Sequence, residues 1–193
     1  MKFGTVQTKY AAGGMLAHSL VCGRDRFRKG KVLDEKDIRQ LIQFGYDEVV
    51  IARLEDNDTE ENLAAAKVAE NIHFLAEPEN FKKSIAFTGR VNIFARTTGI
   101  IVFDEENLIK ANAIDNMITI ATIPNYSQVT KGSIVATIKI ISYGVIASNI
   151  EKVASLAAGT IRLKRPKYLS AHLITTKISR GTSDKSLSAI KKR

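Results

Sequence analysis

The spacing of apolar residues predicts a helix, a glycine turn and a strand early in the chain. Within DEKDIRQLIQF (residues 34–44), three apolar residues recur at i, i+3 and i+4, which is the pattern of one helical face. Asp34 has the position of an N-cap, and Gly45 follows the last turn as a helix stop. The next residues, EVVIARL, are apolar and β-branched, so we predict a strand directly after the turn.

Two further helices are predicted over residues 58–75 and 148–158. Each begins with an Asp or Ser that has a Glu three positions later, which is the spacing of a capping box. The pairs are Asp58 with Glu61 in the first helix and Ser148 with Glu151 in the second. We therefore expect these side chains to cap the two helices.

Strand patterns dominate the region between Pro78 and residue 142. The predicted strands are SIAFTGRVNIFA, GIIVF, MITIATI and SIVATIKIIS, with a short helix over residues 104–116 between the second and the third. In the last strand Lys139 alternates with Ile138 and Ile140, so its side chain must point away from the core face.

The elements together predict an α+β fold with mixed, mostly antiparallel strands and three to four helices. We place this fold in one domain over residues 1–160. Residues 161–193 have the pattern of a basic segment, one strand, a glycine-containing turn and the first turns of a helix. An α/β cofactor-binding domain usually begins with such a strand and capped helix, so we expect this segment to be a truncated βα unit of one.

The net charge of +9 is confined to the C-terminal segment. Residues 1–159 contain 19 basic and 19 acidic residues, whereas residues 160–193 contain 10 basic residues and one acid. Charge confined to a terminal segment fits either an RNA-binding arm or a solvated end. We favour the solvated end and do not expect nucleic acid as a partner, because Tyr168 is the only aromatic ring there that could stack on a base.

The residue content argues against several kinds of site. The single cysteine, Cys22, cannot form an internal disulfide, and the three histidines lie on separate predicted elements without the spacing of a metal motif. The sequence contains neither a GxSxG pattern nor a P-loop, so we assign no catalytic residue. No apolar run has the length of a membrane span or of a secretion signal, and we expect a cytoplasmic protein without a membrane partner.

A polar cluster within an apolar strand pair is the main candidate for a binding site. It consists of Thr88, Gly89, Arg90 and Asn92 in the stretch FTGRVN, together with Lys139 on a later strand. A glycine within a strand can mark the close approach of a ligand, and a guanidinium suits a phosphate or a carboxylate. The alternative is structural: a hairpin or bulge with a solvated arginine at its edge, and a lysine whose stem is buried while its ammonium reaches water.

The order of several sequence blocks resembles one known protein family. The blocks are GGMLAHSL, RKGKVLDEKDIRQLIQFGYDEVVIARLE, FTGRVNIFARTTGIIVFDEENLIKANAIDNMITIATI and GSIVATIKII. Together they are similar to the N-terminal part of bacterial molybdopterin-binding proteins, which are relatives of molybdopterin molybdotransferase and in some cases are fused to a nucleotidyltransferase domain. The resemblance covers roughly residues 1–178.

The resemblance implies a role in molybdenum cofactor biosynthesis, with molybdopterin as the cofactor. In that family the segment corresponding to YLSAHLITTKI opens the cofactor-binding domain, so Thr175, Thr176 and Gly181 become further candidate contacts. Because one βα unit cannot enclose a ligand, we expect a chain that is not catalytically competent alone.

The resemblance and the tail also imply partners. These are other molybdenum cofactor biosynthesis proteins and a second copy of the chain, which would pair through the predicted strand at residues 171–178. The alternative is a non-enzymatic interaction module whose basic C-terminal tail binds RNA or an acidic protein.

Overall fold

The computed structural model describes residues 1–74, 78–168, 170, 172–174 and 188. These residues contain four α-helices, and every strand pair among them is antiparallel. The helices are α1 Glu35–Gln43, α2 Glu61–Phe74, α3 Glu105–Asn112 and α4 Ala147–Ala157, with a short 3₁₀ helix, η1, at Thr8–Tyr10. The predicted α+β fold is confirmed. Across the residues described, no helix has both the length and the apolar character needed to cross a membrane.

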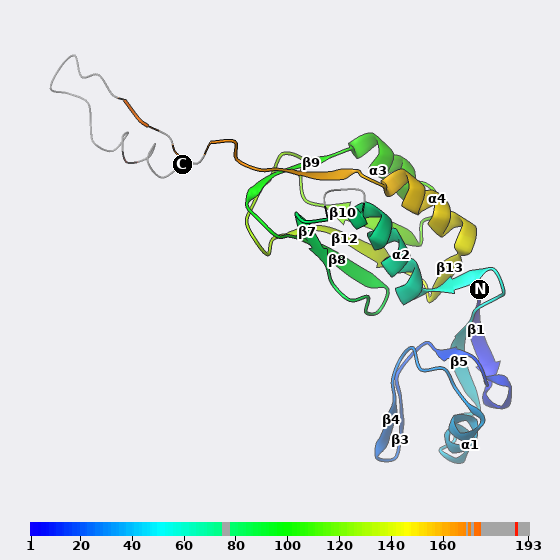
Figure 1. Cartoon of the computed structure of the whole chain (residues 1–193). Coiled ribbons are helices and arrows are strands. Elements are labelled where there is room, and N and C mark those ends of the chain that lie inside the picture. The colour runs from blue at the N-terminus through cyan, green and yellow to red at the C-terminus, as the bar shows by residue number, and fades with distance from the viewer. Residues whose placement is uncertain (75–77, 169, 171, 175–187, 189–193) are drawn as a thin grey trace.

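Residues 1–53 form a small unit that we call the N-terminal body (Figure 1). Its three-stranded sheet has the order β1-β5-β2. The body also contains a separate hairpin of β3 and β4 and the helix α1. The strands are β1 Lys2–Gln7, β2 Met15–Leu16, β3 Leu20–Cys22, β4 Asp25–Phe27 and β5 Glu48–Arg53. Leu16, Cys22, Leu41 and Ile51 bring the two sheets and α1 together in one hydrophobic cluster.

Residues 58–164 form a larger unit, the C-terminal body (Figure 1). It contains a four-stranded sheet of order β10-β12-β8-β7, a three-stranded sheet of order β11-β9-β14, and the short ladder of β13 with β6. The strands are β6 Asp58–Glu60, β7 Phe81–Lys83, β8 Arg90–Ala95, β9 Gly99–Phe103, β10 Ile118–Thr122, β11 Gln128–Val129, β12 Ile134–Ile140, β13 Gly144–Ile146 and β14 Ile161–Lys164. Helix α2 packs on β8 and β12 and against α4.

The two faces of the four-stranded sheet differ in character. On β8, Val91, Ile93 and Ala95 are buried in the hydrophobic cluster that α2 and α4 share. The alternate residues of β8, Arg90 and Phe94 among them, point to the other side, because successive side chains of a strand face opposite ways. Residues on this second side are exposed or half-buried, and we call it the open face.

Helix α1 begins as the sequence predicts. The Asp34 carboxylate accepts hydrogen bonds from the N–H groups of Lys36 and Asp37, both at 2.8 Å. The Asp37 carboxylate in turn accepts the N–H of Asp34 at 3.1 Å, which completes a capping box. Gly45 follows with φ of 81°, as predicted for a helix stop.

The predicted capping boxes of α2 and α4 are wrong. At α2 the Glu60 carboxylate accepts hydrogen bonds from the N–H groups of Asn62 (2.9 Å) and Leu63 (3.1 Å). Asp58 belongs to β6, which pairs with β13, and its carboxylate binds the Met1 ammonium at 2.6 Å. Helix α4 begins without a side-chain cap. Strand pairing therefore takes Asp58 from the first predicted box, whereas Ser148 of the second lies inside α4, which already begins at Ala147.

The two bodies meet around Tyr143. Its hydroxyl donates a hydrogen bond to the Ala17 carbonyl at 2.8 Å, and its ring stacks on Phe3 with centroids 6.1 Å apart. The Lys29 ammonium lies 5.1 Å from the centroid of the same ring. The basic loop after β4 is thus held beside the C-terminal body.

The segment after α4 begins with a strand that belongs to the C-terminal body. Strand β14 pairs with β9, and Ile161 and Leu163 are part of the large hydrophobic cluster. The domain boundary predicted after residue 160 falls just before this strand and stays a prediction. His172–Ile174, inside the strand predicted at residues 171–178, belong to no strand in the structure. Residues 171 and 175–178 lie outside the described residues.

Candidate functional site

The predicted polar cluster begins at the tip of a two-residue hairpin that leads into β8. Phe87 and Arg90 exchange two backbone hydrogen bonds, each of 3.1 Å. The two residues between them, Thr88 and Gly89, both have positive φ, 47° and 66°. This is the geometry of a type I′ turn, which suits glycine and asparagine and strains a β-branched residue.

Gly89 is required by packing as well as by its backbone conformation. A Cβ on Gly89 would lie 2.7 Å from the carbonyl oxygen of Ile140 and 3.1 Å from a Glu61 carboxylate oxygen. Its N–H donates to Asn62 Oδ1 at 2.9 Å, and its carbonyl accepts from Ile140 N–H at 2.7 Å. The glycine therefore locks the hairpin tip onto β12 and the start of α2, which is the structural alternative considered for this residue.

The structure brings the two predicted cations together. Arg90 and Lys139 are direct cross-strand partners on β8 and β12, so their side chains leave the sheet side by side. The Lys139 ammonium donates a hydrogen bond to the Thr88 carbonyl. The Arg90 side chain is exposed and has no ion pair or hydrogen bond within the described part of the chain. We call these two residues the Arg90–Lys139 pair.

One carboxylate lies close to this pair. Glu61, the first residue of α2, is half-buried, and burial raises the pKa of its carboxyl group above the ordinary value. Lys139 and Lys29 oppose this shift by favouring the charged form, while Glu60 adds to it. Lys29, from the N-terminal body, therefore contributes to the same electrostatic environment.

Asn92 is hydrogen-bonded within the sheet through both its side chain and its backbone N–H. Its Oδ1 accepts a hydrogen bond from the Thr137 hydroxyl at 2.9 Å, and its N–H donates to Ser84 Oγ at 3.0 Å. The side chain links β8 to β12 two residues away from Arg90. Among the residues predicted from FTGRVN, Arg90 is the one whose polar side chain makes no hydrogen bond or ion pair within the described part of the chain.

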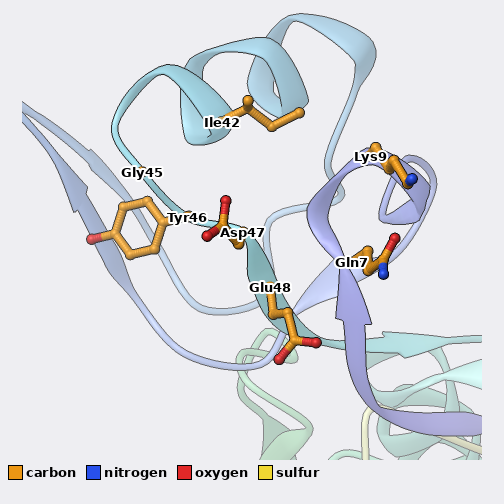
Figure 2. Close-up of a pocket in the computed structure, with 7 residues that line it drawn as sticks. All are labelled: Gln7, Lys9, Ile42, Gly45, Tyr46, Asp47 and Glu48. Carbon is orange, nitrogen blue, oxygen red and sulfur yellow. The ribbon is translucent and has the colours of Figure 1, made fainter.

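A groove of about 740 Å³ lies in the N-terminal body, away from these residues. It is lined by Gln7, Lys9, Ile42, Gly45, Tyr46, Asp47 and Glu48. Figure 2 shows the Tyr46 ring turned away from Gln7 and Lys9, and its hydroxyl donates to the Val21 carbonyl at 3.0 Å. The groove is open and carries both signs of charge. No sequence motif indicated it, because its lining comes from strand ends and turns that only the fold brings together.

Metal and thiol chemistry find little support in the residues that the structure describes. No group of three or more His, Cys, Asp and Glu side chains among them could hold a metal ion. Cys22 is buried, and burial together with nearby Asp25 raises the pKa of its thiol, which disfavours the reactive thiolate. Thr175, Thr176 and Gly181 lie outside the described residues.

Comparison with known protein families finds a match in the N-terminal body. Residues 5–53 match a family model described as a domain of unknown function (DUF8806). The matched segment runs from β1 to the end of β5 and includes the groove of Figure 2. No curated protein and no solved structure matches the chain. The Arg90–Lys139 pair lies outside the matched segment.

Proposed function

We propose that this chain is a molybdenum cofactor biosynthesis protein of the molybdopterin-binding type, which holds the phosphate of molybdopterin at the Arg90–Lys139 pair. It does so without completing a catalytic site of its own. The observation that supports the proposal is the cross-strand register, which places two cations from separate sequence blocks next to each other. Both blocks belong to the stretches that carry the sequence resemblance.

The chemistry of the pair suits a phosphate. A guanidinium presents a planar fork of N–H groups to two phosphate oxygens, and an ammonium adds a compact positive charge. The Lys139 ammonium is held at the Thr88 carbonyl, so its position is fixed before a ligand arrives. The remaining N–H groups of Arg90 and Lys139 can donate hydrogen bonds to phosphate oxygens.

Substitutions at the pair test the proposal. Binding of a phosphate-bearing pterin, followed by its fluorescence, should weaken about 10-fold or more in Arg90→Ala and in Lys139→Ala, since hydrogen bonds to charged groups contribute about 1.5–3 kcal/mol each. Lys152→Ala, on the exposed side of α4, is the matched control and should bind as the unchanged chain does. Equal affinity of all four proteins would contradict the proposal.

The proposed setting is the cytoplasm, with other molybdenum cofactor biosynthesis proteins and a second copy of the chain as partners. A second copy is supported by two apolar residues near the C-terminus, Leu173 and Ile174, whose side chains are 46% and 89% exposed. Light scattering of Leu173→Ser with Ile174→Ser against the unchanged chain tests this part. The unchanged chain should gain mass as its concentration rises, and the double variant should not. Identical masses at every concentration would contradict self-association through this segment.

A further inference from the structure

The sheet register arranges the side chains of the open face in three rows. Each row crosses neighbouring strands, and successive rows are two residues apart along β8, or about 6.6 Å. The first row is Lys82, Phe94 and Ile134; the second is Ser84, Asn92, Thr137 and Ala121; the third is Phe87, Arg90, Lys139 and Thr119. The face is therefore a four-strand surface with a polar row between two rows that each contain an aromatic ring.

The two aromatic rings are placed where a ligand can reach them. Phe94 is half-buried near the end of the inner strand β8, and the Lys82 ammonium lies 5.5 Å from its ring centroid. Phe87 is 76% exposed at the hairpin tip. Phe94 and Arg90 are four residues apart on β8, so the two aromatic rows are about 13 Å apart. An extended polymer that carries an aromatic ring on each unit is long enough to contact both Phe94 and Phe87.

The charge on the open face has one sign. Lys82, Arg90 and Lys139 lie on it, and no Asp or Glu occupies the strand positions of β7, β8, β10 and β12. Outside these strands, the Glu61 carboxylate at the start of α2 interacts electrostatically with Lys139. The face as a whole is complementary to a polyanion.

The polar middle row adds hydrogen-bonding groups between the aromatic rows. Asn92 Oδ1 accepts a hydrogen bond from the Thr137 hydroxyl, and the side-chain NH2 group of Asn92 carries two further donors on the same side of the sheet. A sheet face is a surface and not an enclosing cavity. It can therefore contact several successive units of an extended polymer at once, in addition to a phosphate held at the Arg90–Lys139 pair.

We infer that the open face binds single-stranded nucleic acid, with bases stacked on Phe94 and Phe87 and phosphates near Lys82, Arg90 and Lys139. Aromatic platforms beside a cationic track are the features that bind single strands with little sequence preference. The carboxylates of an acidic protein segment would pair with the three cations but would not stack on the rings of Phe94 and Phe87. This activity goes beyond the proposed function. It also differs from the sequence analysis, which did not expect nucleic acid as a partner and considered RNA binding by the basic tail only as an alternative.

The test uses residues that the pterin proposal does not involve. A fluorescein-labelled single-stranded oligouridine is titrated with the full chain, with Phe94→Leu, with Lys82→Gln and with the control Lys152→Gln, and anisotropy is followed at several salt concentrations. Phe94→Leu should weaken binding about 5- to 100-fold through the loss of base stacking. Lys82→Gln should reduce the slope of log K against log salt by about 0.7, the share of one phosphate contact. Lys152→Gln should match the unchanged chain.

Three results would overturn the inference. One is the absence of oligouridine binding by the full chain. Another is unchanged affinity in Phe94→Leu and Lys82→Gln together with a loss in Lys164→Gln/Lys167→Gln, which would place the binding in the basic tail. The third is equal binding of an oligoglutamate of the same charge, which would show recognition of charge without base stacking. Lys82 is exposed, so its substitution keeps the test valid even where Phe94→Leu lowers the melting temperature.

Discussion

The two faces of the sheet β10-β12-β8-β7 are made by the same four strands and have opposite characters. The face under α2 is closed by aliphatic side chains such as Val91, Ile93 and Ile138, each exposed by no more than 1%. The open face has Arg90, Phe94 and Lys139 at the alternate positions. Alternation along a β-strand places core packing on one face and the proposed ligand contacts on the other, so substitutions one residue apart should have different consequences.

The largest expected effect is on the closed face. Ile138→Ala removes a side chain that is 0% exposed in the centre of the sheet. The cavity and the lost burial should lower the free energy of unfolding by about 2–5 kcal/mol. The adjacent open-face substitution Lys139→Ala should cost less than about 1 kcal/mol, because Lys139 is only half-buried. Urea denaturation measures both, and equal losses would mean that the two faces are not distinct.

An intermediate effect is expected at the hairpin tip that holds the open face in place. Gly89→Ala adds a Cβ at 2.7 Å from the Ile140 carbonyl oxygen and at φ of 66°, so it should destabilise by about 1–3 kcal/mol. Thr88→Asn should have the opposite sign and stabilise by a few tenths of a kcal/mol, because asparagine tolerates positive φ better than a β-branched residue does. Thermal unfolding compares the two. A Gly89→Ala chain as stable as the unchanged one would contradict the packing described for this tip.

Much of this surface could be predicted from local sequence, and its key pairing could not. The alternation of Lys139 with Ile138 and Ile140 is visible in the chain, and so is a glycine in an unusual place within FTGRVN. The juxtaposition of Arg90 and Lys139 depends on the register of two strands 49 positions apart. No local pattern specifies such a register, because it is set by the hydrophobic faces of both strands and by the turns between them.

The capping predictions show the same limit. Asp34 caps α1 because its partners are two and three residues away, within the reach of local spacing. Asp58 fits an equally good local pattern, yet it binds the chain's own ammonium at Met1, because β6 pairs with β13. The groove around Asp47 and Glu48 was missed for a related reason, since β1, α1 and β5 all contribute to it.

The smallest expected effect is the pH dependence contributed by Glu61, the acid at the end of the open face. Burial raises its pKa above the ordinary 4.5. The folded state therefore binds a proton more tightly than the unfolded state, and this group's contribution to stability falls as the pH rises from about 4.5 through the raised pKa. Glu61→Gln should remove that decline, as a flatter profile of melting temperature against pH. A profile parallel to that of the unchanged chain would contradict this assignment.

Glu61→Gln also tests the open face through its effect on the affinity for anionic ligands. It removes the negative charge beside Lys139, so anionic ligands of the open face should bind somewhat more tightly at neutral pH, on the order of 2- to 5-fold for one partly screened charge. Fluorescence titration with a phosphate-bearing pterin measures this. Weaker binding in Glu61→Gln would mean that the carboxylate holds the ligand and does not repel it.

The central claim is that the open face receives the anionic ligand, and backbone amide shifts test it most directly. A titration of the isotope-labelled full chain with a phosphate-bearing pterin should shift the amide signals of Thr88, Arg90 and Lys139, with signals of Ile93 and Val135 on the closed face changing little. Shifts centred on Gln7, Asp47 and Glu48, with those of Arg90 and Lys139 unmoved, would contradict the claim and assign ligand binding to the groove of the N-terminal body.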